Sequence, residues 1–350
     1  MSKVLPEDRS REDEIAQVMM GKPHVVILGA GTSRAACPTG DANGKQLPLM
    51  NDLVDLLGLE RTLEKAGIDH HGRNFEDIYD QLYADDKYSK VRQELEDAVY
   101  GYFSSLQLPE HPTLYDHIVL SLRQKDVIAT FNWDPFLMQA YRRNLAMFEG
   151  RLPRLQFLHG NVTVGYCESD KVLGLNGNDC KKCGTPFVPS KLLYPISAKN
   201  YQLDFLISTE WTELQAALAS AFMITVFGYS APKSDVSAIK LMKDAWGDVY
   251  ARNMEQTEII DIRSEDDLCS TWEPFIHTHH YEVHENFYDS WIANHPRRTG
   301  EAYWNQYWEA NFIENNPIPK EADFPELWAW FARLREVEER ESQPNAGSGS

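Results

Sequence analysis

The stretch that decides the fold is His24-Val25-Val26-Ile27-Leu28-Gly29-Ala30-Gly31-Thr32-Ser33. Its first five residues form a short, mostly β-branched apolar run closed by glycine, which predicts a buried strand. The glycines that follow allow a tight turn into a helix, and free backbone N–H groups at such a turn would face a phosphate. A third glycine at the dinucleotide-binding spacing is missing, so the turn alone is also compatible with a purely structural strand-to-helix connection.

Four more apolar runs predict buried strands, at residues 126–130, 155–158, 223–227 and 258–262. Helical patterns lie between them: one precedes the 126–130 strand, and others follow residues 134, 209 and 234. Strands that alternate with helices favour a parallel sheet covered on both faces. We therefore expect an α/β protein with a Rossmann-like, doubly wound parallel sheet.

Three segments depart from this alternation. Residues 49–110 carry apolar side chains at three- and four-residue spacing, which predicts an inserted helical lobe. Residues 165–195 are rich in Gly, Asn, Asp and Cys, which is typical of a small, loop-rich, cysteine-containing module. Both inserts would belong to a nucleotide-binding domain over residues 20–290, followed by an aromatic-rich helical extension at 291–342 and a flexible tail at 343–350.

Composition limits the partners and the compartment. The 350 residues include 34 basic and 53 acidic ones, and the net charge of −19 disfavours binding to nucleic acid or anionic membranes. The longest apolar stretch, residues 216–227, is shorter than the roughly 20 residues of a membrane-spanning helix. The first residues are charged, and the five cysteines do not form the pattern of a secreted disulfide scaffold. We expect a soluble cytoplasmic protein with small-molecule or protein partners.

Polar residues follow the predicted strands directly. Asn132 and Asp134 follow the second strand, His159 the third, and Gly228-Tyr229-Ser230 the fourth. The carboxyl ends of parallel strands meet at one sheet edge, where ligands bind in open α/β sheets. Taken singly, Asp134 is better explained as the cap of a helix that Pro135 begins, and His159 as a structural histidine. Taken together, they predict one site.

The order of these motifs resembles the sirtuin superfamily, over roughly Val25 to Arg263. The motifs are Gly-Ala-Gly-x-Ser, Thr-x-Asn-x-Asp, His-Gly and Gly-x-Ser. The resemblance implies that the protein binds NAD as its substrate, with Asn132 and Asp134 at the nicotinamide and its ribose and His159 as the general base. It further implies that the rest of NAD contacts Gly29, Ala30, Gly31, Thr32, Ser33, Thr130, Gly228, Ser230, Asp261 and Arg263.

One departure from the family bears on the reaction. Protein-deacylating sirtuins carry a Gly-Ile-Pro-Asp-Phe-Arg segment after the glycine turn, whereas residues 34–40 here read Arg-Ala-Ala-Cys-Pro-Thr-Gly. The run through Leu47-Pro48 into a helix is instead similar to divergent bacterial sirtuin-like proteins that hydrolyse NAD in defence against phage. This implies an NAD glycohydrolase with water as the acceptor. The alternatives are an NAD-dependent protein deacylase and a non-catalytic module that senses NAD or ADP-ribose.

Uncontrolled NAD hydrolysis would be toxic to the host cell. The chemistry and the resemblance therefore imply a gated enzyme, controlled by assembly into a homo-oligomer, by an activating protein partner or by a ligand. Trp304, Tyr307, Trp308 and Asn311 recur at helical spacing, a stripe typical of a core or of a subunit interface.

The cysteines suggest a structural metal site. Cys180-Lys181-Lys182-Cys183 is a zinc knuckle and Cys167 stands upstream, but the fourth thiolate of a complete site is missing. A histidine or Asp170 would have to complete the set, since Cys269 lies far along the chain. Bound zinc and a relic knuckle with free thiols both stay open. For the histidines at positions 277, 279, 280 and 284, a half-exposed edge strand is the better interpretation than a second metal site.

Overall fold

The computed structural model describes residues 9–196, 201–202, 204–252, 254–276 and 280–342, so the predicted flexible tail lies outside the described residues. Its centre is a six-stranded sheet in the order β3-β2-β1-β7-β8-β9, with every pair parallel. The strands are β1 His24–Leu28, β2 Val127–Thr130, β3 Arg154–Phe157, β7 Met223–Phe227, β8 Gln256–Ile260 and β9 Tyr281–His284. The chain builds outward from β1 to β3 and then returns to β7 on the other side of β1. This is the Rossmann-like order, so the predicted fold class is confirmed.

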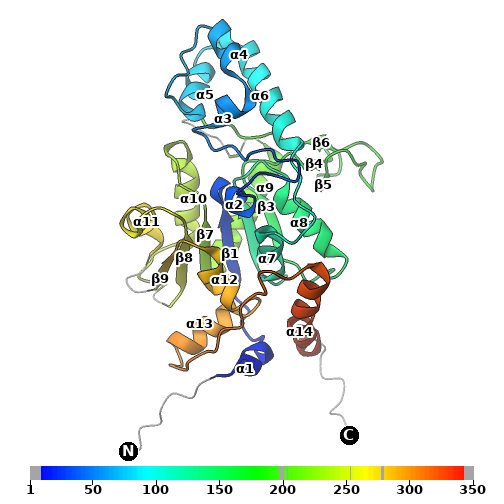
Figure 1. Ribbon diagram of the computed structural model, residues 1–350, viewed down its shortest axis with the longest axis vertical. Helices are drawn as coiled ribbons and strands as arrows, with labels where there is room; N and C mark the ends of the chain where they lie inside the picture. The colour runs from blue at the N-terminus through cyan, green and yellow to red at the C-terminus, as the bar shows by residue number, and fades with distance from the viewer. Residues whose placement is uncertain (1–8, 197–200, 203, 253, 277–279, 343–350) are drawn as a thin grey trace, which may run out of the picture.

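Helices cover both faces of the sheet, as Figure 1 shows. Side chains alternate along β1, so that Val25 and Ile27 join one apolar cluster and Val26 and Leu28 the other. The first cluster includes residues of α9 Phe205–Ser220, α10 Val236–Trp246 and α11 Glu265–Trp272. The second includes residues of α7 Leu114–Leu120, α8 Phe136–Leu145 and α12 Trp291–Asn294. The sheet is therefore doubly wound.

Two strand predictions need comment. The strand predicted at residues 258–262 begins two residues earlier, at Gln256, and ends at Ile260. Its first two residues are polar but buried; the Gln256 backbone N–H donates to the Phe222 carbonyl, and the Thr257 hydroxyl donates to the Phe275 carbonyl. Residues 261 and 262 thus lie beyond the strand. The predicted half-exposed edge strand is confirmed at Tyr281–His284, while His277 and His279 lie outside the described residues.

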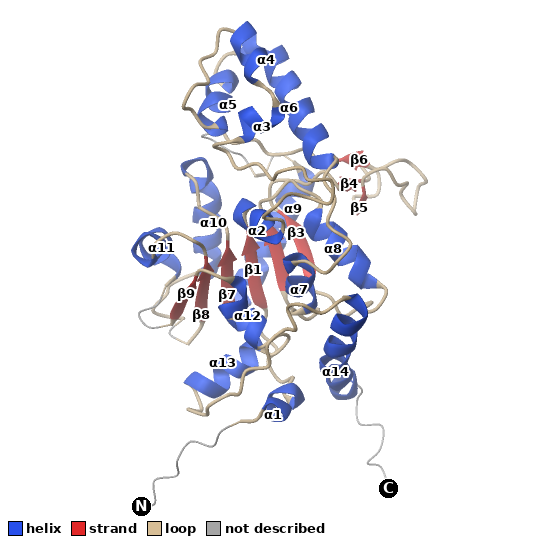
Figure 2. Ribbon diagram, viewed as in Figure 1, coloured by secondary structure: helices blue, strands red, loops and turns tan. Residues whose placement is uncertain are grey.

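The helical lobe stands over the carboxyl edge of the sheet, toward which the strand arrows point in Figure 2. It consists of α3 Leu53–Leu57, α4 Glu60–Lys65, α5 Phe75–Tyr83, the 3₁₀ turn η1 Asp86–Tyr88 and α6 Ser89–Ser104. Its buried Leu63 and Phe75 belong to the same apolar cluster as Val26 of β1. The lobe is therefore packed onto the sheet domain through a continuous core.

The cysteine-containing module forms a small antiparallel sheet in the order β5-β4-β6. Its strands are β4 Val164–Tyr166, β5 Leu173–Leu175 and β6 Val188–Pro189. The prediction of a loop-rich module is confirmed. An added Cβ at Gly174 would lie 2.2 Å from the Phe187 ring, so any larger residue there would displace that ring.

Both ends of the described chain lie at the opposite edge, near α1 Arg11–Ala16, α13 Thr299–Tyr307 and α14 Phe324–Ser342 (Figure 2). The remaining elements are three 3₁₀ turns, η2 Lys233–Asp235, η3 Glu273–Phe275 and η4 Phe287–Asp289. The aromatic-rich helical C-terminal region is confirmed as part of the fold, whereas its predicted boundaries stay predictions. Within the described residues, every helix is too short or too polar to cross a membrane.

Candidate functional site

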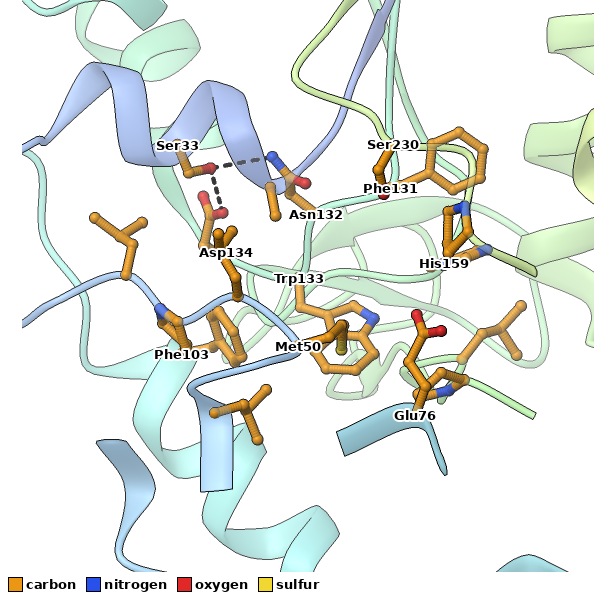
Figure 3. A pocket seen from close by; sticks show the side chains of 18 of the residues that line it. Ser33, Met50, Glu76, Phe103, Phe131, Asn132, Trp133, Asp134, His159 and Ser230 are labelled. Atoms are coloured by element: carbon orange, nitrogen blue, oxygen red, sulfur yellow. Dashed lines mark hydrogen bonds between the residues drawn. The ribbon is translucent and has the colours of Figure 1, made fainter. Parts of the chain in front are cut away.

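A pocket of about 110 Å³ opens at the carboxyl edge of the sheet, beneath the helical lobe (Figure 3). Its floor comes from residues that follow β2, β3 and β7, and its roof from the segment before α3 and from α5 and α6. The lining residues are Ala30, Ser33, Leu47, Pro48, Leu49, Met50, Leu53, Glu76, Phe103, Phe131, Asn132, Trp133, Asp134, His159, Leu193, Pro195, Ser230, Pro232 and Asp235. The three predicted catalytic residues are thus brought together in one cavity.

Four polar side chains form a buried network on one side of the pocket. Ser33 Oγ donates to Asp134 Oδ2 at 2.6 Å, and the hydroxyl of Tyr115 lies 2.6 Å from the same Oγ. Asn132 Nδ2 donates to Ser33 Oγ at 3.0 Å and to the Gly29 carbonyl at 2.8 Å. Figure 3 shows the bonds from Ser33 to Asn132 and Asp134. These contacts hold the Asn132 amide in one orientation.

Asp134 is a buried carboxyl group that contacts both the polar network and the start of α8. Burial raises its pKa to about 6, while hydrogen bonds from Ser33 and from the Phe136 amide act against that rise. The bond from the Phe136 amide, at 3.1 Å, also supports the first turn of α8. The helix begins at Phe136 with Pro135 at its N-cap position, so Asp134 lies one residue before the cap and not at it, as expected from the sequence, and still accepts the first amide of the helix. Above about pH 6 this carboxyl carries a negative charge at the pocket wall.

His159 is held on several sides. Its Nε2 lies 3.2 Å from the Tyr201 hydroxyl and 3.7 Å from Asp235 Oδ1. The Phe131 ring meets the imidazole edge to face, with centroids 4.7 Å apart. Only 6% of His159 is exposed. The imidazole therefore reaches the pocket from a buried and ordered position.

The glycine turn packs backbone to backbone against the end of β7. The N–H groups of Gly29 and Gly31 donate to the carbonyls of Phe227 and Gly228, at 3.0 and 2.9 Å. An added Cβ on Gly31 would lie 2.8 Å from the Gly228 Cα, and Gly228 itself has a φ of +60°. The glycines are needed for this close approach. The expectation of free N–H groups at the turn is wrong for Gly29 and Gly31, because their hydrogens are already bonded.

Other predicted ligand residues lie outside the pocket lining. The Thr130 hydroxyl accepts the backbone N–H of Asn132 at 3.0 Å and so helps to fix the backbone of this site residue. Asp261 and Arg263 follow β8 and form an ion pair with each other at 3.1 Å. Of the glycine turn, only Ala30 and Ser33 line the cavity, together with Ser230 from the loop after β7.

Sequence reasoning missed several groups that the structure places at this site. Tyr115 comes from the buried helix α7, and Glu76 comes from α5 of the lobe. No local pattern singles out either residue, since their position depends on how separate elements pack. Asp235 had a signal, because it lies in the connection after β7, at the sheet edge that collects ligands.

The pocket is acidic and aromatic. Glu76, Asp134 and Asp235 line it, and Phe131 and Trp133 add aromatic surface. Among the described lining residues none is lysine or arginine. Carboxylates and aromatic faces attract a cationic, flat group and repel an anion. The cavity therefore suits a positively charged ring better than a phosphate.

The cysteine module brings four metal-ligating side chains together. Cys167, Asp170, Cys180 and Cys183 each offer one ligand atom, and these atoms all lie within 4.8 Å of one another. The Sγ atoms of Cys167 and Cys183 are 3.4 Å apart, and Cys180 Sγ is 3.2 Å from Asp170 Oδ2. Three thiolates and a carboxylate fit the tetrahedral preference of Zn²⁺. Of the fourth ligands left open by the sequence, the structure brings Asp170 to the cluster.

In the histidine-rich edge strand β9, His284 lies beside carboxylates. His284 lies 3.5 Å from Glu258 and 3.4 Å from Glu282, so its neighbours are carboxylates. Within the part of the chain that the structure describes, the cysteine module holds the sole group of metal-ligating side chains.

No family model and no curated protein matches the chain. Among solved structures it is similar to a Sir2 homologue in complex with NAD, at 15% identity over 97% of this chain and 98% of that one, with a TM-score of 0.38. It is also similar to a mutant Sir2 homologue in complex with ADP-ribose, at 14% identity over 95% and 96% of the two chains, with a TM-score of 0.40. Likenesses this distant assign no role to any residue of this chain.

Proposed function

We propose that this protein is an NAD glycohydrolase that releases nicotinamide and ADP-ribose. The observation that carries the proposal is the convergence of Asn132, Asp134 and His159, from the ends of neighbouring strands, on an acidic and aromatic pocket. This pocket lies where the strand order reverses, which is where α/β sheets of this topology bind nucleotides. The nicotinamide ring of NAD is a flat cation, the kind of group that such a pocket attracts.

In the proposed reaction the bond between ribose C1′ and the nicotinamide nitrogen breaks. Nicotinamide leaves with the bonding electrons, and positive charge develops on the ribose. Asp134, ionised above about pH 6, stabilises this charge, and Asn132 orients the nicotinamide or its ribose. Water then attacks C1′ and transfers its proton to His159. Ser33 and Tyr115 hold Asn132 and Asp134 in place through the buried network.

Binding of the whole dinucleotide requires the site to open. Ligand pockets usually enclose about 300–1,000 Å³, whereas this cavity has about 110 Å³. Residues 47–50 form part of its roof, so we propose that this segment moves outward when NAD enters. In this proposal the nicotinamide ring occupies the acidic cavity, the pyrophosphate lies along the glycine turn at its margin, away from the carboxylates, and the adenosine end points toward Asp261 and Arg263.

The sequence resemblance extends the proposal to a biological role. We propose a gated effector of bacterial defence against phage, held inactive until a homo-oligomer assembles or a protein partner binds. The exposed rings of Trp304, Tyr307, Trp308 and Phe312 support a role of α13 and the segment after it in such contacts.

The test is to incubate the purified protein with NAD, over a range of protein concentrations, and to quantify nicotinamide and ADP-ribose by chromatography. We expect both products, and a loss of at least about 100-fold in kcat for the Asn132→Ala and His159→Ala variants. His71→Ala is the matched control, since His71 is exposed on the lobe. Circular dichroism and thermal unfolding would verify that each variant is folded.

Three outcomes would contradict the proposal. Undiminished NAD hydrolysis by both variants would refute the site. Consumption of NAD only when an acylated lysine peptide is present would identify a protein deacylase. Calorimetric binding of NAD without products at any protein concentration would favour a sensing module.

A further inference from the structure

We infer that Asp235 is a positioning residue that orients His159 and strengthens it as a base, with Tyr229 fixing the carboxylate from behind. The inference rests on the proposed role of His159. Asp235 ends the 3₁₀ turn η2 in the connection after β7, whereas His159 follows β3. Two separate parts of the sheet edge therefore supply the pair.

The Asp235 carboxylate is directed at the imidazole and not at its own helix. Asp235 occupies the N-cap position of α10, where an aspartate side chain ordinarily accepts a backbone N–H, but it makes no such cap bond. Instead its Oδ2 accepts the Tyr229 hydroxyl at 2.8 Å, and its Oδ1 lies 3.7 Å from His159 Nε2. A capping role thus fails to explain this side chain.

Burial makes the pair energetically significant. Asp235 is 3% exposed and His159 6% exposed, so water screens their charges poorly. A carboxylate beside an imidazole favours the protonated ring, and it also favours the neutral tautomer with its hydrogen on Nε2. In that tautomer the lone pair that accepts a proton lies on Nδ1. By favouring the protonated ring, the carboxylate makes His159 a stronger base toward water or a ribose hydroxyl.

Aromatic rings keep the imidazole in this orientation. The Tyr201 ring stacks on His159 with an interplanar angle of 14° and centroids 5.8 Å apart. Phe131 contacts the imidazole edge to face and stacks on Tyr229, with centroids 4.0 Å apart and an angle of 3°. Phe131 thus contacts both His159 and Tyr229, the tyrosine that is hydrogen-bonded to Asp235. The four rings and the carboxylate form one packed unit.

Among the described residues, the other charged groups that line the cavity beside this unit are acidic. Glu76 reaches the pocket from α5, and Asp134 reaches it from the segment after β2. Burial raises the pKa values of both Tyr201 and Tyr229, and Asp235 raises them further, so both hydroxyls stay neutral at physiological pH. Because Asp235 Oδ1 lies 3.7 Å from His159 Nε2 and both side chains are buried, removing the charge of Asp235 should have a clear effect on the titration of the imidazole.

The experiment compares the wild-type protein with Asp235→Asn, a variant of nearly equal shape without the charge. NMR of histidine labelled in the imidazole ring follows the titration of His159 in the intact protein without NAD, and a His159→Gln spectrum assigns the signal. We expect the pKa of His159 to fall by about 1 unit or more in Asp235→Asn. Asp244→Asn on the exposed face of α10 is the matched control and should leave this titration unchanged.

Kinetics supply the second readout. In Asp235→Asn the acidic limb of the pH profile of kcat should move to lower pH by the same amount, and kcat should fall roughly 10- to 100-fold with little change in KM. Tyr229→Phe should give a smaller change in the same direction. An unchanged His159 titration in Asp235→Asn would overturn the inference, whatever the effect on thermal stability. A shifted titration in a protein that leaves NAD intact would support the pair and refute the proposed hydrolysis instead.

Discussion

At Asp134, burial and hydrogen bonding act on one carboxyl group in opposite directions. Burial prevails and raises the pKa to about 6, against bonds from Ser33 and from the Phe136 amide. An aspartate in the unfolded chain titrates near pH 3.9. Because the folded pKa is the higher one, the stabilisation that this group contributes is fully present below about pH 4 and is lost as the pH rises through 6. Function and stability therefore make opposite demands on this carboxyl, since the proposed chemistry needs it ionised.

Asp134→Asn removes this titration. We expect the stability of the wild-type protein relative to the variant to fall by roughly 2–3 kcal/mol between pH 4 and pH 7.5, at about 1.4 kcal/mol per pKa unit. Urea unfolding of both proteins at several pH values measures the difference. The exposed Asp266→Asn is the control. A constant difference between wild type and Asp134→Asn across this range would mean that Asp134 titrates normally.

Individual residues of the candidate site could be predicted where they directly follow an apolar run that forms a strand. Asn132, Asp134 and His159 each follow an apolar run, and the topology then brings strand ends to one edge. Glu76 had no such marker, because its place in the pocket depends on how the lobe packs over the sheet. Hydrogen bonding is equally invisible in the sequence, as the occupied N–H groups of Gly29 and Gly31 show.

At the scale of elements, apolar runs correctly predicted where the strands of the main sheet lie, but they predicted the first and last residues of these strands less well. The start of β8 was missed because Gln256 and Thr257 are polar residues that lie buried in the strand, where no apolar run marks them. In the cysteine module, the spacing of Cys180 and Cys183 identified a knuckle. The spacing did not identify Asp170 as the fourth ligand, because Asp170 joins the knuckle only when the segment after β4 folds back toward it.

We propose that this module binds zinc through Cys167, Asp170, Cys180 and Cys183. Metal analysis of the purified protein should find about one zinc per chain, with a structural role. Cys180→Ser and Asp170→Ala should lower the zinc content and make the module sensitive to protease, because metal binding is what orders such small modules. Cys269→Ser, in α11, should retain full zinc. A wild-type protein that is free of metal after expression with added zinc would instead show a relic knuckle with free thiols.

At the scale of the whole molecule, alternation of strands and helices was enough to predict a doubly wound sheet. It was not enough to place the two ends of the described chain, because these are held by contacts between distant segments. Arg298 donates to the carbonyl of Ile15 in α1, and Arg297 donates to the carbonyls of Leu120 and Leu122. Both guanidinium groups also donate to Glu338 of α14, at 2.6 and 2.7 Å. One buried carboxylate thus joins α1, α7 and α14.

Glu338 is therefore the residue whose loss should loosen the whole fold. Burial opposes its ionisation, yet the charges and hydrogen bonds of Arg297 and Arg298 lower its pKa to about 2. Since the folded pKa is depressed, the stabilisation from this carboxylate is present above about pH 4.5 and is lost as the pH falls through 2.

Glu338→Gln removes the carboxylate that Arg297 and Arg298 share, and it should lower the free energy of unfolding by about 3–5 kcal/mol at pH 7, as measured by urea unfolding. Glu339→Gln, next along α14, is the matched control. Glu339 pairs with Arg335 and Arg151 at the surface, where such pairs contribute about 0–1 kcal/mol. The difference between the two variants in free energy of unfolding should become smaller as the pH falls from 5 toward 2. Over this range the Glu338 carboxyl, which the control variant retains, takes up a proton. If both variants unfold at the same urea concentration at pH 7, the ends of the chain are held by apolar packing and not by this ion cluster.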